Sequence, residues 1–144
     1  MRVTRRVAVC LPIAAAGLGM IGFTLVGFNA AAQSAETIKI GVVIPMTGVQ
    51  GAVGREIADA TKLYMAQHGD TVAGKKIELI IRDDGTIPDN AKRLAQELVV
   101  NDKVNFLGAG LTPSAMAMAP IATEAKVPTV IMVSGTSVVT ERSP

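Results

Sequence analysis

Cysteine, histidine and aromatic residues are almost absent from this sequence of 144 residues. It has no tryptophan, one histidine (His68) and one cysteine (Cys10), which lies in a segment that we expect to be removed. The rest of the chain can therefore form neither a disulfide nor a cysteine-based metal site. Beyond residue 32 the aromatic residues are Tyr64 and Phe106, too few for the stacking surfaces that hold nucleic-acid bases.

Acidic residues are absent from residues 1–32, which begin with three arginines and continue as an uncharged apolar run. A basic start, an apolar run and small residues at its end are the layout of a secretory signal peptide. We predict cleavage after Ala32, with Ala35 as the second choice. A membrane anchor is the alternative, because the run is long enough to span a bilayer. The pair Arg5–Arg6 leaves twin-arginine export open beside the general route.

Positive charge is scarce once this segment is removed. The formal net charge falls from +2 to −1, because residues 1–32 hold three arginines and no acidic residue. A weakly acidic chain offers little positive surface for phosphates, so we expect no nucleic-acid partner.

Strand-like and helix-like patterns alternate along residues 33–144, which we take as one domain. Apolar runs rich in β-branched residues predict strands at 37–45, 77–82, 104–107 and 127–133. Helical patterns lie between them, at 54–67, 86–99 and 112–125. This alternation predicts an α/β fold, a parallel sheet with helices on both faces. The pattern ends on a loop with no closing helix, so we expect the front part of a longer protein whose first lobe is incomplete here.

The second helical pattern is the clearest of the three. Its apolar residues recur at the spacing of one helix face: Ala91, Leu94, Ala95, Leu98 and Val99. In the first pattern we expect Ile57, Ala60 and Tyr64 to share the inward face. We also expect Thr86 and Thr112 to be N-caps, each shortly before a proline that suits a first helical turn.

A glycine-rich loop separates the first strand from the first helix, with glycines at Gly48, Gly51 and Gly54. Strand, glycine loop and helix often hold a phosphate, but the spacing here is G-x-x-G-x-x-G rather than the dinucleotide pattern G-x-G-x-x-G. The G-K-[ST] of a phosphate-binding loop is also missing. We therefore expect no nucleotide and no other cofactor.

Residues suited to catalysis are few and poorly placed. Ser134 follows a strand but lacks the glycines of the G-x-S-x-G nucleophile elbow. His68 lies in a turn at the far end of a helix. Asp83 and Asp84 could form an acid pair or a metal site, but we favour a strand end and helix entry with acids near a positive helix N-terminus. We expect no catalytic residues and no metal.

Hydroxyl groups gather in the loops that follow the predicted strands. They are Thr47, Thr112, Ser114, Ser134, Thr136 and Ser137. Ligands of open α/β sheets bind outside the carboxyl ends of the strands. Hydroxyls and free N–H groups at a helix start can hold a carboxylate without a counter-ion. The alternative is that these residues only cap helices and form turns.

From Ile38 to Pro144 the chain resembles the solute-binding proteins of branched-chain-amino-acid-type ABC importers, a leucine-binding-protein-like family. The resemblance rests on an ordered set of segments: "IKIGVVIPMTGVQGAVGREI", "KKIELIIRDDGTIPDN" and "KVPTVIMVSGTSVVTERSP". It implies a two-lobed periplasmic protein that captures a small carboxylate solute between its lobes, which close by a hinge motion. Its partner would be an ABC permease in the inner membrane.

The resemblance also implies which residues bind the solute. In amino-acid-binding members, loops after the third and fourth strands of the first lobe grip the ligand carboxylate with hydroxyls and backbone amides. The matching positions here are Thr112, Ser114, Ser134 and Thr136. The glycine loop and Thr47 would form one wall of the cleft. Val53 would face the ligand's side chain, where many members carry an aromatic residue.

The solute and the setting of the domain stay open at this stage. The segment "VSGTSVVTERSP" is closer to members that take up other organic acids, including aromatic carboxylates, than to amino-acid binders. A ligand-sensing domain of the same fold in a signalling receptor is a second hypothesis. An exported α/β enzyme is a third, which would need a base or nucleophile beyond residue 144.

Overall fold

The computed structural model describes residues 36–142 of the chain. The predicted signal peptide and both predicted cleavage positions lie outside the described residues. Among the residues that are described, no helix is both long enough and apolar enough to cross a membrane.

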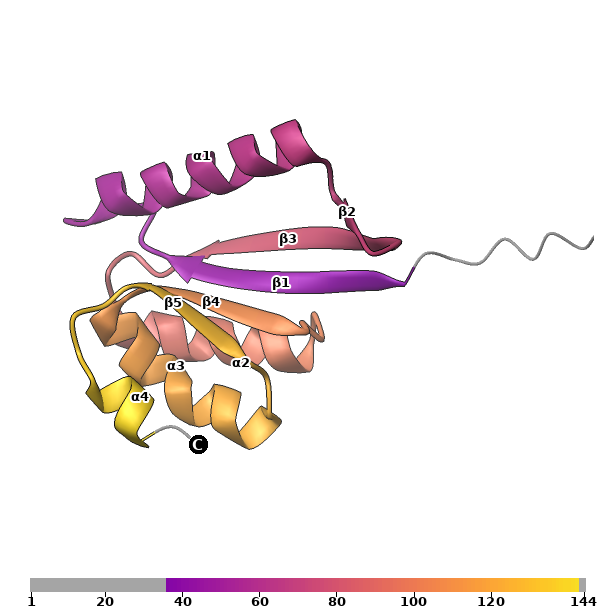
Figure 1. Ribbon diagram of the computed structural model, residues 1–144. Helices are drawn as coiled ribbons and strands as arrows, with labels where there is room; N and C mark the ends of the chain where they lie inside the picture. The colour runs from indigo at the N-terminus through magenta and orange to yellow at the C-terminus, as the bar shows by residue number, and fades with distance from the viewer. Residues whose placement is uncertain (1–35, 143–144) are drawn as a thin grey trace, which may run out of the picture. The chain divides into compact units, whose positions relative to one another are not determined.

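A five-stranded sheet forms the centre of the fold, in the order β2-β3-β1-β4-β5 (Figure 1). The strands are β1 (Thr37–Ile44), β2 (Thr71–Val72), β3 (Lys75–Asp83), β4 (Phe106–Leu111) and β5 (Thr129–Val133). All neighbours pair in parallel except β2, which forms a short antiparallel hairpin with β3. The chain adds β3 on one side of β1 and then β4 on the other. Strand order therefore switches around β1, the kind of point where a crevice forms at the carboxyl ends.

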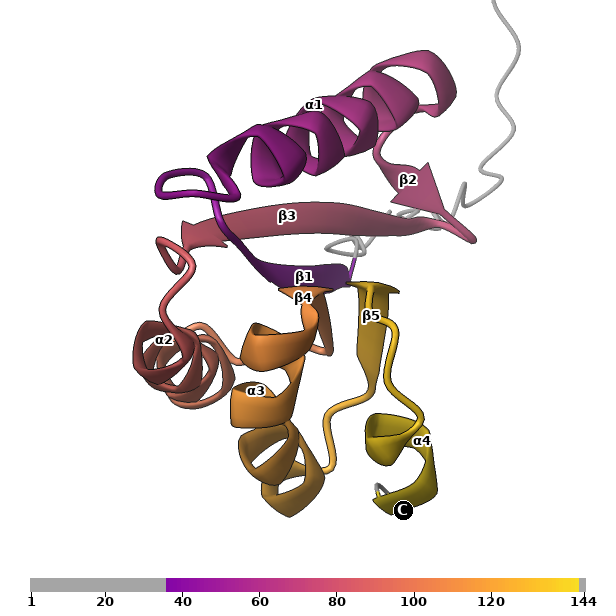
Figure 2. The ribbon, with the colours of Figure 1, turned by 90° about the vertical axis from the view of Figure 1, so that its left-hand side faces the viewer.

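Helices cover both faces of the sheet, which confirms the predicted α/β class (Figure 2). They are α1 (Gly51–His68), α2 (Pro88–Val100), α3 (Thr112–Ala125) and α4 (Val138–Arg142). Helix α1 lies on one face, and α2 and α3 lie on the other. The prediction that the chain ends on a loop was wrong, because α4 follows β5 after a short connection.

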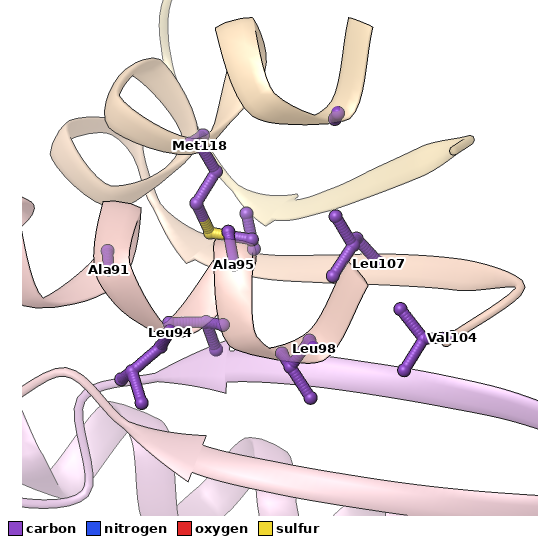
Figure 3. Close-up of a cluster of buried hydrophobic side chains, with 11 residues drawn as sticks. Ala91, Leu94, Ala95, Leu98, Val104, Leu107 and Met118 are labelled. Carbon is purple, nitrogen blue, oxygen red and sulfur yellow. The ribbon is translucent and has the colours of Figure 1, made fainter. Parts of the chain in front are cut away.

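The larger core lies between the sheet and α2 and α3 (Figure 3). The predicted apolar face of α2 is confirmed: Ala91, Leu94, Ala95 and Leu98 are buried and Val99 is partly buried. Met118 from α3 and Leu107 from β4 complete this core, with exposed fractions of 0% and 1%. Burying a large apolar side chain contributes about 1.5–3 kcal/mol, so this face holds α3 firmly to the strands that precede and follow it.

The smaller core lies under α1, where Val42 and Ile44 of β1 contact Ala58. The predicted inward face of α1 was wrong at two of three positions. Ile57 packs against this core, but Ala60 and Tyr64 are exposed, and the Tyr64 ring stacks on His68. The buried residues are instead Gly51, Gly54 and Ala58, so α1 begins three residues before the predicted start at Gly54 and the two glycines set its inward face.

Both predicted threonine N-caps were also wrong. Thr86 lies in the turn before α2 with φ 67°, and Ile87 is the N-cap. Thr112 is the first residue of α3, after Leu111 as N-cap. Neither helix start has a side-chain cap hydrogen bond.

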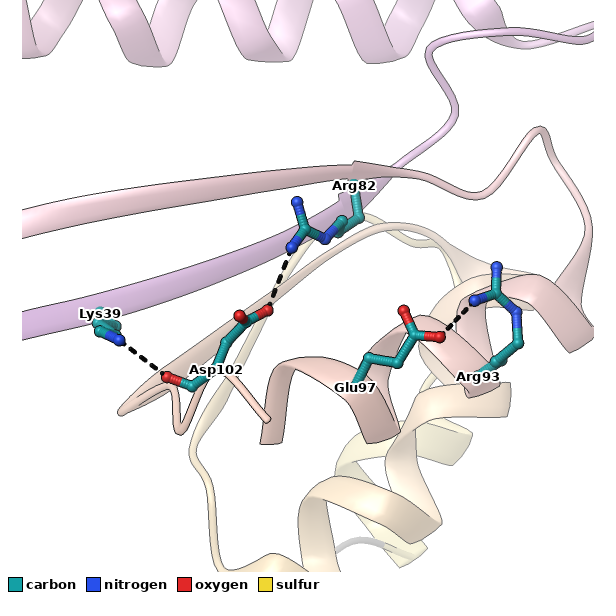
Figure 4. Close-up of polar contacts among 5 residues, drawn as sticks. All are labelled: Lys39, Arg82, Arg93, Glu97 and Asp102. Carbon is teal, nitrogen blue, oxygen red and sulfur yellow. Dashed lines mark hydrogen bonds and ion pairs between the residues drawn. The ribbon is translucent and has the colours of Figure 1, made fainter. Parts of the chain in front are cut away.

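A separate polar cluster ties the turn after α2 to the sheet (Figure 4). Arg82 Nη2 lies 3.2 Å from Asp102 Oδ2, and Lys39 Nζ donates to the Asp102 carbonyl at 3.2 Å. A further ion pair, between Arg93 and Glu97, lies along α2. Ion pairs exposed to this extent contribute about 0–1 kcal/mol each, so they add little to the stability of the fold.

Candidate functional site

Two of the hydroxyls predicted to hold a carboxylate lie side by side at the carboxyl end of the sheet. Thr112 begins α3 directly after β4, and Ser134 follows β5. Their Oγ atoms are 2.9 Å apart. The parallel register of β4 and β5 causes this meeting, because Leu111 and Val133, the residues before them, are partners across the strands. Ser134 is exposed and Thr112 is half-buried, so solvent reaches the pair.

Thr136 lies two residues further along the same loop and is half-buried. Its Oγ1 accepts a hydrogen bond from the Val138 N–H at 3.3 Å, so it caps the start of α4. A hydroxyl that accepts one bond keeps its own proton as a donor. Thr136 can therefore cap the helix and donate to a solute.

Ser114 lies in a different environment from the other predicted residues. It is 2% exposed, and its hydroxyl donates to Asp84 Oδ2 at 2.5 Å. The hydroxyl is thus directed into the protein. A contact between Ser114 and a solute stays a prediction.

Thr47, in the loop after β1, is hydrogen-bonded to Asp83. The Asp83 carboxylate accepts the Thr47 hydroxyl at 2.7 Å and the N–H groups of Met46, Thr47 and Gly85 at 2.7, 3.2 and 2.9 Å. Partial burial acts to raise the pKa of the Asp83 carboxyl, but these four hydrogen bonds outweigh it and hold the pKa below its ordinary value. Asp83 therefore links the loop after β1 to the loop after β3 by hydrogen bonds.

Low pH will weaken the hydrogen bonds that the Asp83 carboxylate accepts, and with them the stability of the fold. A carboxyl whose pKa is lower in the folded state stabilises the fold above its unfolded pKa, about 3.9, and the benefit is lost as the pH falls through the folded pKa. Solvent screening of an exposed side chain limits the effect to about 1 kcal/mol. We expect the Tm of Asp83→Asn to lie a few degrees below wild type at pH 7, with the gap closing toward pH 3.

Thermal denaturation followed by circular dichroism across this pH range measures the difference. Asp59→Asn, which changes an exposed acid on α1, is the matched control. A gap for Asp83→Asn that stays constant from pH 7 to pH 3 would contradict the assignment.

The glycine loop makes its contacts with protein. Gly48 has φ 78°, and a Cβ there would lie 2.7 Å from the Gly85 carbonyl oxygen. Arg55 Nη1 donates to the Met46 carbonyl at 2.8 Å. Val53 is half-buried in the first turn of α1, beside this loop. The loop is thus packed against protein at the carboxyl edge. Its role as a wall of a solute cleft and a role for Val53 against a solute stay predictions.

Asp83 and Asp84 were interpreted as a strand end and helix entry. The hydrogen bonds of their carboxylates to other loops and helices were not predicted. Successive residues of a strand point to opposite faces. Asp83 accordingly turns to the loop after β1, while Asp84 turns to the start of α3. That alternation was the available signal. Within residues 36–142, no group of three or more histidine, cysteine, aspartate or glutamate side chains could hold a metal ion.

Comparison with known proteins identifies the family. The model of the periplasmic binding protein family matches residues 37–144. The chain belongs to this family. It is a family of binding proteins, which confirms the expected binding protein over an exported enzyme.

The relatives of this periplasmic binding protein include one that is named for amino-acid binding and others whose structures were solved with aromatic acids. A Leu/Ile/Val-binding protein homolog from Brucella abortus is 35% identical over 129 residues, 88% of this chain and 33% of the relative. A solute-binding protein of an ABC transporter from Rhodopseudomonas palustris BisB5, solved with 3,4-dihydroxybenzoic acid, is 62% identical, with a TM-score of 0.73 over 75% of this chain and 30% of that one.

A second solute-binding protein from Rhodopseudomonas palustris, solved with 4-hydroxybenzoate, is 41% identical, with a TM-score of 0.70 over 76% of this chain and 30% of that one. The chain thus spans about a third of the length of the relatives it matches.

Proposed function

We propose that this chain is the front part of the substrate-binding subunit of an ABC importer, and that it holds the carboxylate of a hydroxybenzoate. The observation that carries the proposal is the pair of neighbouring hydroxyls, Thr112 and Ser134, with Oγ atoms 2.9 Å apart at the carboxyl ends of β4 and β5. In the proposed cycle, residues 1–32 direct export to the periplasm. A second lobe of the complete protein then closes over the solute, and an ABC permease in the inner membrane receives it.

The chemistry of the pair suits a carboxylate. In the free protein one hydroxyl donates to the other. A bound carboxylate would accept from both, from the Thr136 hydroxyl, and from N–H groups at the start of α3, where negative charge is favoured. Hydrogen bonds to a charged acceptor contribute about 1.5–3 kcal/mol each. Neutral donors can therefore bind the anion without a cation.

A hydroxybenzoate is favoured over an amino acid on two grounds. The structure solved with 3,4-dihydroxybenzoic acid is 62% identical to this chain, against 35% for the Leu/Ile/Val-binding homolog. The resemblance also implies that Val53 stands where many members of the family carry an aromatic side chain. A smaller residue at that position leaves space for the ring of the solute.

Thermal-shift screening tests the proposal on the protein expressed from its complete reading frame. A ligand at a hundred times its Kd adds about 2.7 kcal/mol of stability, which raises Tm by several degrees. We expect 3,4-dihydroxybenzoate and 4-hydroxybenzoate to produce this shift, 4-hydroxybenzamide to produce a much smaller one, and leucine to produce none. A shift with leucine alone would assign the protein to amino acids, and no shift with either acid would contradict the proposal.

A further inference from the structure

Asp84 is a fully buried carboxylate that the proposed solute contacts do not use. Its exposed fraction is 0%. Oδ2 accepts the Ser114 hydroxyl, and Oδ1 accepts the Thr86 N–H at 2.9 Å. A buried charge is costly unless hydrogen bonds satisfy it, so the groups that bond to Asp84 indicate its role.

The backbone of Asp84 joins further parts of the carboxyl edge. Its N–H donates to the Ile44 carbonyl at the end of β1 at 3.3 Å. Its carbonyl accepts the Ile87 N–H at 3.0 Å and the Asn90 side chain at 3.4 Å, both at the start of α2. Asp84 therefore contacts the end of β1, the start of α2 and the first turn of α3.

The first turn of α3 lacks the usual means of being held. It has no side-chain cap hydrogen bond, and Pro113 in that turn has no N–H to offer. The Ser114–Asp84 hydrogen bond is a buried side-chain link between this turn and the end of β3. It lies in the same turn as Thr112, whose hydroxyl meets Ser134.

We propose that Asp84 is a positioning residue for the carboxylate site. Through Ser114 it fixes the first turn of α3, and with it the Thr112 hydroxyl and the neighbouring N–H groups, relative to Ser134. The inference rests on the proposed function for the identity of the solute. It assigns the buried Asp84–Ser114 pair to solute selection as well as to stability.

The test compares Ser114→Ala with wild type, using protein from the complete reading frame. Calorimetry gives the Kd for 4-hydroxybenzoate and for 4-hydroxybenzamide at high concentration. We expect Ser114→Ala to raise the Kd for the acid about ten-fold and to change the Kd for the amide about two-fold or less. Thr61→Ala removes a helical hydroxyl from α1, where it donates to the Ile57 carbonyl at 2.8 Å, and should change neither Kd.

A second variant guards against loss of folding. Ser114→Ala leaves the buried carboxylate one hydrogen bond short, whereas replacing both partners of a buried pair can be nearly neutral. The double variant Asp84→Ala, Ser114→Ala also frees the Thr86 N–H, but Thr86 is only half-buried, so water can bond to that group. The double variant should therefore fold and show the same loss of preference for the acid. An acid-to-amide Kd ratio equal to that of wild type in a folded variant would overturn the inference and leave the pair a structural role alone.

Hydrogen exchange separates this inference from the proposed function. The amides of residues 116–118 bond to carbonyls of the first turn of α3, so their exchange rates report on that turn without any solute. We expect faster exchange there in the double variant and wild-type rates in Thr61→Ala. Unchanged rates at 116–118 would overturn the role of Asp84. Failure of the wild-type protein to bind either acid would instead overturn the proposed function.

Discussion

Replacing Gly54 with alanine will destabilise the fold by about 3 kcal/mol. A Cβ at this position would lie 1.9 Å from the Pro45 carbonyl oxygen and 2.5 Å from its carbon. Both atoms belong to the backbone, so no side-chain rotation can relieve the contact. Helix α1 would have to move away from the end of β1, and the small core around Ile44 and Ala58 would open.

Urea denaturation followed by circular dichroism measures this loss as a change in the free energy of unfolding. Gly135→Ala is the matched control, since a Cβ there meets nothing within 4 Å, and it should cost less than about 0.5 kcal/mol. Equal stability of Gly54→Ala and Gly135→Ala would show that α1 does not depend on close contact with β1.

The alternation of strands and helices could be predicted because each element has a strong local pattern. The β-branched run of β1 and the apolar face of α2 are visible in the sequence and were confirmed. The hairpin strand β2 is two residues long and exposed, and α4 is five residues long. Elements this short carry too little periodicity to be recognised.

The errors arose where tertiary contact outweighed local preference. Gly51 was assigned to a loop before the helix, yet it lies in the first turn of α1. A residue without a side chain is needed there and at Gly54, because a Cβ would lie 3.0 Å from the Met46 carbonyl oxygen at Gly51 and 1.9 Å from the Pro45 carbonyl oxygen at Gly54. The threonine caps failed because both hydroxyls bond elsewhere: Thr86 donates to the Thr47 carbonyl at 3.5 Å, and Thr112 pairs with Ser134. These partners lie 39 and 22 positions away in the sequence and have no local signal.

The candidate site could be predicted in outline. Thr112 and Ser134 were placed on neighbouring carboxyl-end loops, and the register of β4 with β5 brings their hydroxyls into contact. The direction of a side chain was not predictable in the same way. The Ser114 hydroxyl donates to Asp84 and the Thr47 hydroxyl donates to Asp83, because each carboxylate needs hydrogen-bond donors.

Removing both hydroxyls of the central pair will weaken solute binding more than any other change of similar size. In the double variant Thr112→Val/Ser134→Ala, the solute carboxylate loses two hydrogen-bond donors. Each bond to this charged acceptor contributes about 1.5–3 kcal/mol. We expect the Kd for 4-hydroxybenzoate to rise by about a hundred-fold or more. The fold should be retained, because valine matches threonine in shape and Ser134 is exposed.

Two comparisons make this expectation specific. Thr71→Val replaces an exposed threonine in the β2–β3 hairpin, which lies at the opposite edge of the sheet from β5, and should leave Kd unchanged. The single variants Thr112→Val and Ser134→Ala should each cost about ten-fold. A loss confined to one single variant would mean that only that hydroxyl contacts the solute.

The most direct test of the central claim is a calorimetric titration of 4-hydroxybenzoate into the wild-type protein and into Thr112→Val, Ser134→Ala, both expressed from the complete reading frame. The account predicts saturable binding to the wild type and a Kd at least about a hundred-fold higher in the variant, with both proteins folded. Equal affinity of the two proteins would place the carboxylate elsewhere and contradict the claim that the ends of β4 and β5 hold it.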